Sequence, residues 1–174
     1  MKNMKKDFVM PMIVLSLVCL FITGALAIGN NITQPIIEEA AAERAREIKR
    51  TIFPYTDDFD QIENEDFPKT ITEVFAASDG SGYIFMVQTH GYGGYIDIIC
   101  GIGTDGIIIK TVTLAETETQ GIATPVFDMQ SEYIGKDKHL EGIDAISGAT
   151  ITSNAYINGI RDAFAAFEII RGAA

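Results

Sequence analysis

The chain has 174 residues, a formal net charge of -11 and two cysteines, which fits one domain plus a short accessory segment. The acidic balance argues against a nucleic-acid partner, which needs a basic surface, and against broad adhesion to anionic lipid. Two cysteines are too few for an iron–sulfur cluster held by four thiolates. Cys19 in an apolar segment and Cys100 far from it predict no disulfide framework.

The first feature in chain order is an apolar segment at residues 8–28, which contains no charged side chain. About 20 apolar residues suffice to cross a bilayer as a helix. The lysines within residues 1–7 place that end in the cytoplasm by the positive-inside rule, with the remainder of the chain outside. A cleaved signal peptide is the competing interpretation, because Ala25-Leu26-Ala27 follows its layout. The length of the run favours a retained transmembrane anchor in the lipid bilayer.

Residues 29–54 are expected to form a stalk helix between this anchor and a folded domain. Thr33 followed by Pro35 is typical of a helix start, with threonine as the N-cap and proline in the first turn. Acidic residues come early and basic residues late in the segment, which suits the helix dipole. Pro54 predicts its end. An ordinary surface helix of the domain is an alternative compatible with the same pattern.

Residues 55–174 are expected to form the domain itself. Residues 55–69 are acidic and aromatic and are expected to be a loop lying on it. Strand-like runs separated by short turns follow at residues 73–77, 83–90, 95–102 and 107–115. Such turns predict antiparallel hairpins, and a short helix is expected over 127–133. The predicted fold class is α+β: one N-terminal transmembrane helix, a stalk helix, then an antiparallel-sheet domain with flanking helices.

A motif at residues 144–153, Asp-Ala-Ile-Ser-Gly-Ala-Thr-Ile-Thr-Ser, precedes the last helical pattern. Gly148 and Ala149 leave room for a bulky group beside the Thr150 hydroxyl. Thr152 or Ser153 is a suitable N-cap, so the motif is expected just before a helix N-terminus, where free N–H groups favour a phosphate. An ordinary helix cap is the alternative. Apolar residues at spacings of three and four mark the helix: Ile157, Ile160, Phe164, Phe167 and Ile170.

This motif resembles the flavinylation motif of the FMN-binding domain family, whose members include subunits of the Rnf complex and of the Na⁺-translocating NADH:quinone reductase. In that family the last threonine carries FMN through a phosphoester bond to its hydroxyl, and the matching residue is Thr150. The acidic residue of the motif belongs to the signature read by the attaching enzyme. The resemblance implies a binding site that also includes Asp144, Ser147, Gly148, Ala149 and Thr152.

Two further stretches resemble the family in the same order. One is Gly91-Tyr92-Gly93-Gly94, followed by strand, turn and strand. The other resembles a Glu-Thr-Pro-Gly-Leu-Gly loop that packs against the flavin, although Gln120 and Ala123 depart from its pattern and leave the loop backbone open. The resemblance implies flavin contacts at Glu118, Thr119, Gly121 and Ile122.

The resemblance implies an electron-transfer subunit with covalent FMN in a membrane ion-translocating ferredoxin:NAD oxidoreductase. Its expected partners are the other membrane subunits and a flavin transferase for maturation. A free-standing exported flavoprotein carrier, and a non-flavin surface or pilin-like protein, stay open as alternatives. No residue of the chain indicates self-standing catalysis, and His90 and His139 lack the spacing of a metal pair, so no metal site is expected.

Overall fold

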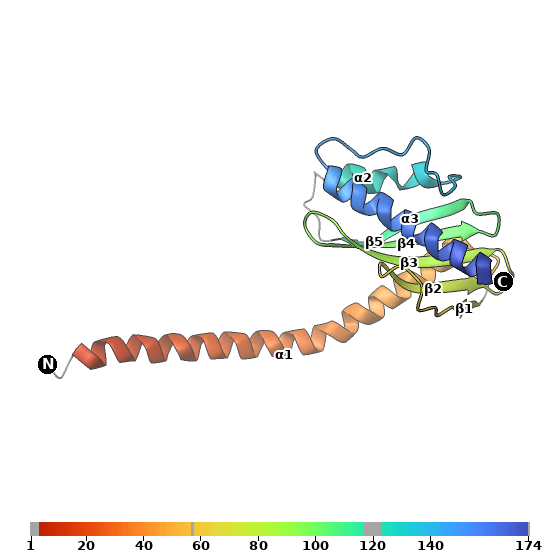
Figure 1. Ribbon diagram of the computed structural model, residues 1–174. Helices are drawn as coiled ribbons and strands as arrows, with labels where there is room; N and C mark the ends of the chain where they lie inside the picture. The colour runs from red at the N-terminus through yellow and green to blue at the C-terminus, as the bar shows by residue number, and fades with distance from the viewer. Residues whose placement is uncertain (1–3, 57, 117–122, 174) are drawn as a thin grey trace. The chain divides into compact units, whose positions relative to one another are not determined.

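The computed structural model describes residues 4–56, 58–116 and 123–173, and the chain divides into two units, Met1–Glu43 and Arg44–Ala174 (Figure 1). Helix α1, Met4–Ile52, runs across that boundary and contains Pro11 and Pro35. The expected separate helix start at Thr33 is therefore wrong. The Thr33 hydroxyl does not cap a helix but donates to the Gly29 carbonyl at 2.9 Å, one turn back in the same helix.

The N-terminal part of α1 is the apolar one. Within it, Val9–Ile37 is long and apolar enough to cross a membrane. Its large hydrophobic side chains are exposed, for example Phe21 and Leu20 at 78% and 74%. This apolar helix is consistent with a membrane anchor.

The second unit contains a five-stranded antiparallel sheet in the order β1-β2-β3-β4-β5. The α+β prediction is confirmed. The strands of the sheet are β1 Phe59–Gln61, β2 Ile71–Ala77, β3 Gly82–His90, β4 Tyr95–Gly103 and β5 Ile108–Glu116. Only β1 was not expected. It forms in the acidic segment because its three residues pair with the end of β2, from Phe59 opposite Ala77 to Gln61 opposite Phe75.

Three helical elements follow the sheet in sequence: α2 Thr124–Asp128, the 3₁₀ helix η1 Met129–Tyr133, and α3 Thr150–Ala173. The short helix expected over 127–133 thus begins earlier, with Pro125 in its first turn, and tightens to a 3₁₀ helix. Helix α3 covers one face of the sheet, chiefly on β3 and β4 (Figure 1). Its predicted apolar side is confirmed, because Ile160, Phe164 and Phe167 are buried in the core.

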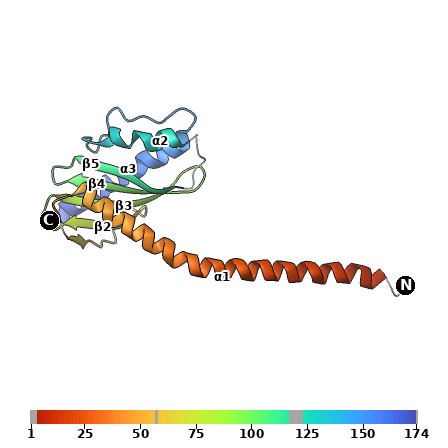
Figure 2. The same ribbon diagram turned by 180° about the vertical axis from the view of Figure 1, so that it is seen from behind.

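The other face of the sheet is covered by the end of α1, within the second unit (Figure 2). Ile52 and Phe53 are buried there against Ala77, Ile84 and Ile99. The five-stranded sheet thus lies between α3 and the last turn of α1.

Candidate functional site

Helix α3 begins earlier than the sequence indicates. Its first residue is Thr150, so Thr152 and Ser153 lie inside the first turn and the expectation that one of them is the N-cap is wrong. Both are buried, at 3% exposure. The Ser153 hydroxyl donates to the Ala149 carbonyl at 2.9 Å and accepts the Ile146 amide at 3.1 Å. The side chain of Ser153, inside the helix, therefore holds the preceding loop by two hydrogen bonds. These bonds explain why the helix begins next to Ala149 and not at Thr152 or Ser153.

Thr150 itself is exposed. Its hydroxyl lies 3.4 Å from the Ile146 carbonyl oxygen, which is a long hydrogen bond. Gly148 has φ +88°, and apart from its own atoms and its two chain neighbours no heavy atom lies within 4 Å of where its Cβ would stand. Ser147 and Asp144 are exposed, whereas Ala149 is buried. The loop thus presents an accessible hydroxyl beside open space.

The electrostatics of this helix end favour an anion. Helix α3 has 24 residues and no acidic residue in its first turn. Its first N–H groups and the positive end of its dipole lie beside the Thr150 hydroxyl. A phosphate group at that position is stabilised by both. The open backbone at Gly148, the exposed hydroxyl and the helix N-terminus together fit a group that carries a phosphate.

The β3–β4 hairpin reaches the same end of the sheet (Figure 1). The buried Thr89 hydroxyl, one residue before the end of β3, donates to the Ala155 carbonyl of α3 at 3.2 Å. Gly159 of α3 lets the helix approach closely, since a Cβ there would lie 3.2 Å from Val87. The Gly91-Tyr92-Gly93-Gly94 turn and the Thr150 motif, far apart in sequence, therefore lie at the same end of the domain (Figure 1).

The turn carries aromatic rings for which the sequence predicted no role. Tyr92 and Tyr95 are exposed, at 72% and 58%. The His90 ring contacts the Tyr95 ring edge-on with centroids 5.1 Å apart, and its Nδ1 lies 2.8 Å from the Gly91 carbonyl oxygen. The signal for them in the sequence was the presence of aromatic residues on both sides of a glycine-rich turn. They form an aromatic surface at the same sheet end as Thr150.

The last strand also ends there. Glu116, at the end of β5, pairs with Ile96 near the start of β4. The expected flavin contacts that follow in sequence, Glu118, Thr119, Gly121 and Ile122, lie outside the described residues. The chain is described again from Ala123, which is buried.

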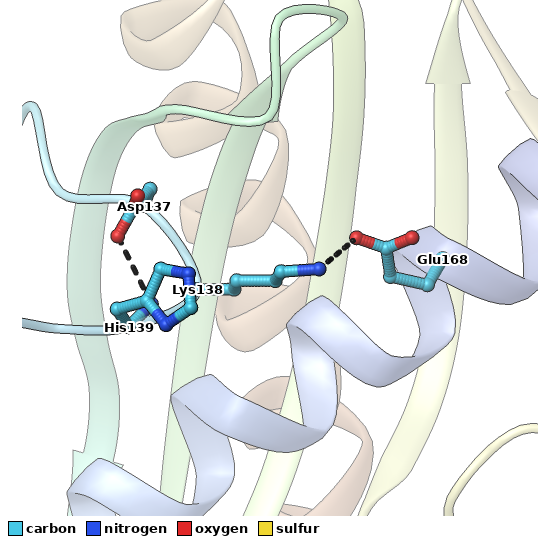
Figure 3. A network of polar contacts seen from close by, with 4 residues as sticks. All are labelled: Asp137, Lys138, His139 and Glu168. Atoms are coloured by element: carbon cyan, nitrogen blue, oxygen red, sulfur yellow. Dashed lines mark hydrogen bonds and ion pairs between the residues drawn. The ribbon is translucent and has the colours of Figure 1, made fainter.

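The loop between η1 and α3 is held by polar contacts. Asp137 accepts the His139 amide at 3.0 Å, and Lys138 forms an ion pair with Glu168 of α3 at 3.2 Å (Figure 3). Lys136 donates to the Glu141 carbonyl at 2.7 Å. His139 contributes its backbone amide to this network. These contacts set the path of the chain into the Thr150 motif.

Cys19 and Cys100 are both free, and burial raises the pKa of the Cys100 thiol. Among the residues that the structure describes, no group of three or more His, Cys, Asp or Glu side chains could hold a metal ion. Within that part of the chain, the exposed threonine at the helix start is the feature best suited to carry a cofactor.

Comparison with known proteins identifies the class of this site. Residues 91–165 match the FMN-binding domain, a stretch that runs from the β3–β4 turn through the Thr150 motif into α3. The second unit therefore contains a stretch that matches an FMN-binding domain. This match confirms the resemblance to the FMN-binding domain family that the motifs predict.

Curated relatives match most of the chain. It is 28% identical over 187 residues to the G subunit of the ion-translocating oxidoreductase complex of Shewanella piezotolerans, covering 91% of this chain and 88% of the relative. It is 26% identical over 165 residues to the G subunit of the Na(+)-translocating ferredoxin:NAD(+) oxidoreductase complex of Acetobacterium woodii, covering 78% and 80%. The proton-translocating counterpart from Clostridium ljungdahlii is also 26% identical, covering 86% and 85%.

Proposed function

We propose that this chain is the FMN-carrying electron-transfer subunit of a membrane-bound, ion-translocating ferredoxin:NAD oxidoreductase of the Rnf type. Three observations support the proposal: the FMN-binding domain match, relatives over most of the chain that are named as the G subunits of such complexes, and the apolar helix Val9–Ile37. The observation that carries it is the exposed Thr150 hydroxyl at the start of α3, inside the matched domain.

We assign Thr150 as the covalent attachment point, through a phosphoester bond between FMN and its hydroxyl. Bound FMN holds one or two electrons and so links one-electron and two-electron partners. Gly148 and Ala149 leave the approach to the hydroxyl free of large side chains, and the α3 N-terminus stabilises the phosphate. Exposed Asp144 and Ser147 are available for recognition by a flavin transferase. Thr152, which belongs to the same proposed site, is buried in the first turn of α3.

The four contacts in the 118–122 stretch, Glu118, Thr119, Gly121 and Ile122, belong to the same proposal. They follow directly on β5, which ends beside the start of β4 at the sheet end near α3. An apolar side chain such as isoleucine suits contact with the flavin ring, and glycine allows backbone dihedrals closed to other residues. Together with Thr150 they complete the proposed cofactor site.

We further propose that residues 8–28 are a retained anchor in the lipid bilayer, with residues 1–7 cytoplasmic, a stalk over 29–54 and the domain at 55–174 outside. The lysines before the apolar run support this orientation. Protease added to the outside of intact spheroplasts is expected to remove the domain and to spare an N-terminal tag. Digestion of the tag instead would reverse the orientation.

The covalent site is tested by intact mass and in-gel fluorescence of protein made together with a flavin transferase. Wild type is expected to gain the mass of FMN minus one water and to fluoresce after denaturation. Thr150→Ala is expected to lose both signals. Thr104→Ala, which alters an exposed threonine in the β4–β5 turn, is the matched control and should keep both. An unmodified wild type, or a modified Thr150→Ala, would refute the assignment.

Copurification with other membrane subunits distinguishes the complex subunit from a free-standing exported flavoprotein. A tagged chain that carries FMN and brings stoichiometric partners out of the membrane supports the proposal. A flavinylated chain that always purifies alone would favour the free carrier, and a chain without flavin would favour a surface protein.

A further inference from the structure

A basic groove lies on the sheet face opposite α3, where α1 ends. Its volume is about 380 Å³, and it is lined by Arg46, Lys49, Arg50, Asp58, Phe59 and Phe75. All six residues belong to the second unit. The proposed FMN site is at the start of α3, so this groove takes no part in holding the flavin.

The groove concentrates positive charge in an acidic chain. The whole sequence has 13 Lys and Arg against 24 Asp and Glu, yet three cations and one carboxylate line this groove. Arg46 and Arg50 are exposed and four residues apart on α1, so they project from one side of the helix. Opposite charge is therefore attracted to this groove and repelled by much of the remaining chain.

One cation is held in place by an aromatic ring. The Lys49 ammonium lies 3.0 Å from the centroid of the Phe75 ring, a cation–π contact. Burial lowers the pKa of Lys49, while the nearby Glu73 carboxylate opposes that shift. Phe59 and Phe75 are half-buried and pack against the core beneath the groove. The two phenylalanines thus form an apolar floor of the groove, and the three basic side chains form its rim.

We propose that this groove is the docking site for an acidic segment of another subunit of the same complex, a segment with at least two carboxylates and one apolar side chain. This rests on the proposed function. Guanidinium groups bind carboxylates in a bidentate manner, so Arg46 and Arg50 suit the two acids. The half-buried Phe59 and Phe75 in the groove lining suit the apolar side chain. Arginine and aromatic residues are also the types enriched where protein interfaces derive their affinity.

Charge favours a short protein segment over a membrane surface. Electrostatic interactions in physiological salt are largely screened beyond about 8 Å. A short acidic segment in the groove therefore senses mainly the groove lining, in which three cations outnumber the Asp58 carboxylate. An extended anionic bilayer would also face the acidic remainder of the chain, whose formal net charge is -11 as a whole.

The test compares two double charge reversals in the full-length chain, produced with the rest of the complex. Arg46→Glu/Arg50→Glu alters the groove, and Arg161→Glu/Arg171→Glu makes the same charge change on exposed positions of α3. The groove variant is expected to keep FMN fluorescence in a denaturing gel and to lose copurifying subunits by about tenfold or more. The α3 variant is expected to retain them.

A groove variant that copurifies like wild type overturns the proposal, and so does an α3 variant that loses the subunits equally. A wild-type chain that carries FMN but brings no partner refutes the proposed complex, and the docking proposal with it. These outcomes distinguish an error in the docking surface from an error in the proposed function.

The occupant is tested by the reactivity of Lys49 toward an amine reagent, with exposed Lys138 as the reference lysine. Both the complex and the isolated chain are placed in nanodiscs of phosphatidylcholine, with or without phosphatidylglycerol. Lys49 is expected to be protected in the complex and reactive in the isolated chain, whichever lipid is present. Protection by phosphatidylglycerol alone would identify a lipid headgroup as the occupant. Protection that grows with the concentration of the isolated chain would identify a second copy. Either result overturns the proposal.

Discussion

The hydroxyl of Ser153 accepts a hydrogen bond from the backbone amide of Ile146 at 3.1 Å, so a residue inside α3 holds the loop before it. The same hydroxyl donates to the Ala149 carbonyl at 2.9 Å. Because Ser153 is buried, little water reaches its hydroxyl to compete for either bond. The position of Thr150, between the two bonded segments, depends on this side chain.

Ser153→Ala is therefore expected to lower the free energy of unfolding by about 1–3 kcal/mol, since it leaves the Ile146 amide without its partner. It is also expected to reduce the fraction of chain that acquires FMN. Thermal unfolding and in-gel flavin fluorescence measure the two effects. Asn154→Ala, at the exposed neighbouring position, is the control and should leave both near wild type. Unchanged flavin loading in Ser153→Ala would show that the loop keeps its path without this contact.

The end of α1 packs so closely on the sheet that Gly101 of β4 has no room for a side chain. A Cβ there would overlap Cγ2 of Ile52. Gly101→Ala is expected to destabilise the domain by about 1–3 kcal/mol through overpacking. Ile52→Ala is expected to cost about 2–5 kcal/mol through loss of buried volume.

The Gly101→Ala/Ile52→Ala double variant is expected to be more stable than the sum of the single effects, by about 1 kcal/mol or more, because the second change removes the overlap. The chain has no tryptophan, so denaturant unfolding is best followed by circular dichroism. Gly29→Ala, where a Cβ meets nothing within 4 Å, is the matched glycine control. Strict additivity would contradict the close approach of α1 to β4.

Two buried tyrosines predict a loss of stability at alkaline pH. Burial raises the pKa of Tyr156 from 10.0 to about 12, and the nearby Thr111 and Thr113 hydroxyls oppose this shift. The Tyr156 hydroxyl nevertheless has no hydrogen-bond partner among the described residues. Burial also raises the pKa of Tyr133, whose ring centroid lies 5.4 Å from that of Tyr156. Between pH 10 and 12 the unfolded chain has released the Tyr156 proton and the folded chain retains it. Stability that is complete below pH 10 therefore falls as pH rises.

Tyr156→Phe is expected to reduce that fall by up to about 1.4 kcal/mol per pH unit. At neutral pH the same variant is expected to be near neutral or slightly stabilising, because the Tyr156 hydroxyl has no hydrogen-bond partner among the described residues. Unfolding midpoints at neutral pH and across the alkaline range measure both effects. A loss of several kcal/mol at neutral pH would instead indicate that a buried water satisfies the hydroxyl.

The four long strands, the apolar side of α3 and the Thr150 motif are all predictable from the amino-acid sequence. These depend on local properties: alternation within strands, turns such as Asp79-Gly80-Ser81-Gly82, and spacings of three and four from Ile157 onward. Ile160 and Phe167 are buried in the core where their spacing places them. The family motifs could likewise be recognised in the sequence, because each is a contiguous stretch of residues.

Where these pieces meet, and where the helices begin, depends on long-range packing. Helix α1 continues through Pro35, and α3 begins at Thr150 because the Ser153 hydroxyl binds the loop. The Thr89–Ala155 hydrogen bond brings the glycine-rich turn to the Thr150 end, and the Lys49–Phe75 contact forms part of the basic groove. Each of the last two joins residues distant in sequence. Local propensity contains no information about such pairs, since their free energy arises only once the sheet has packed.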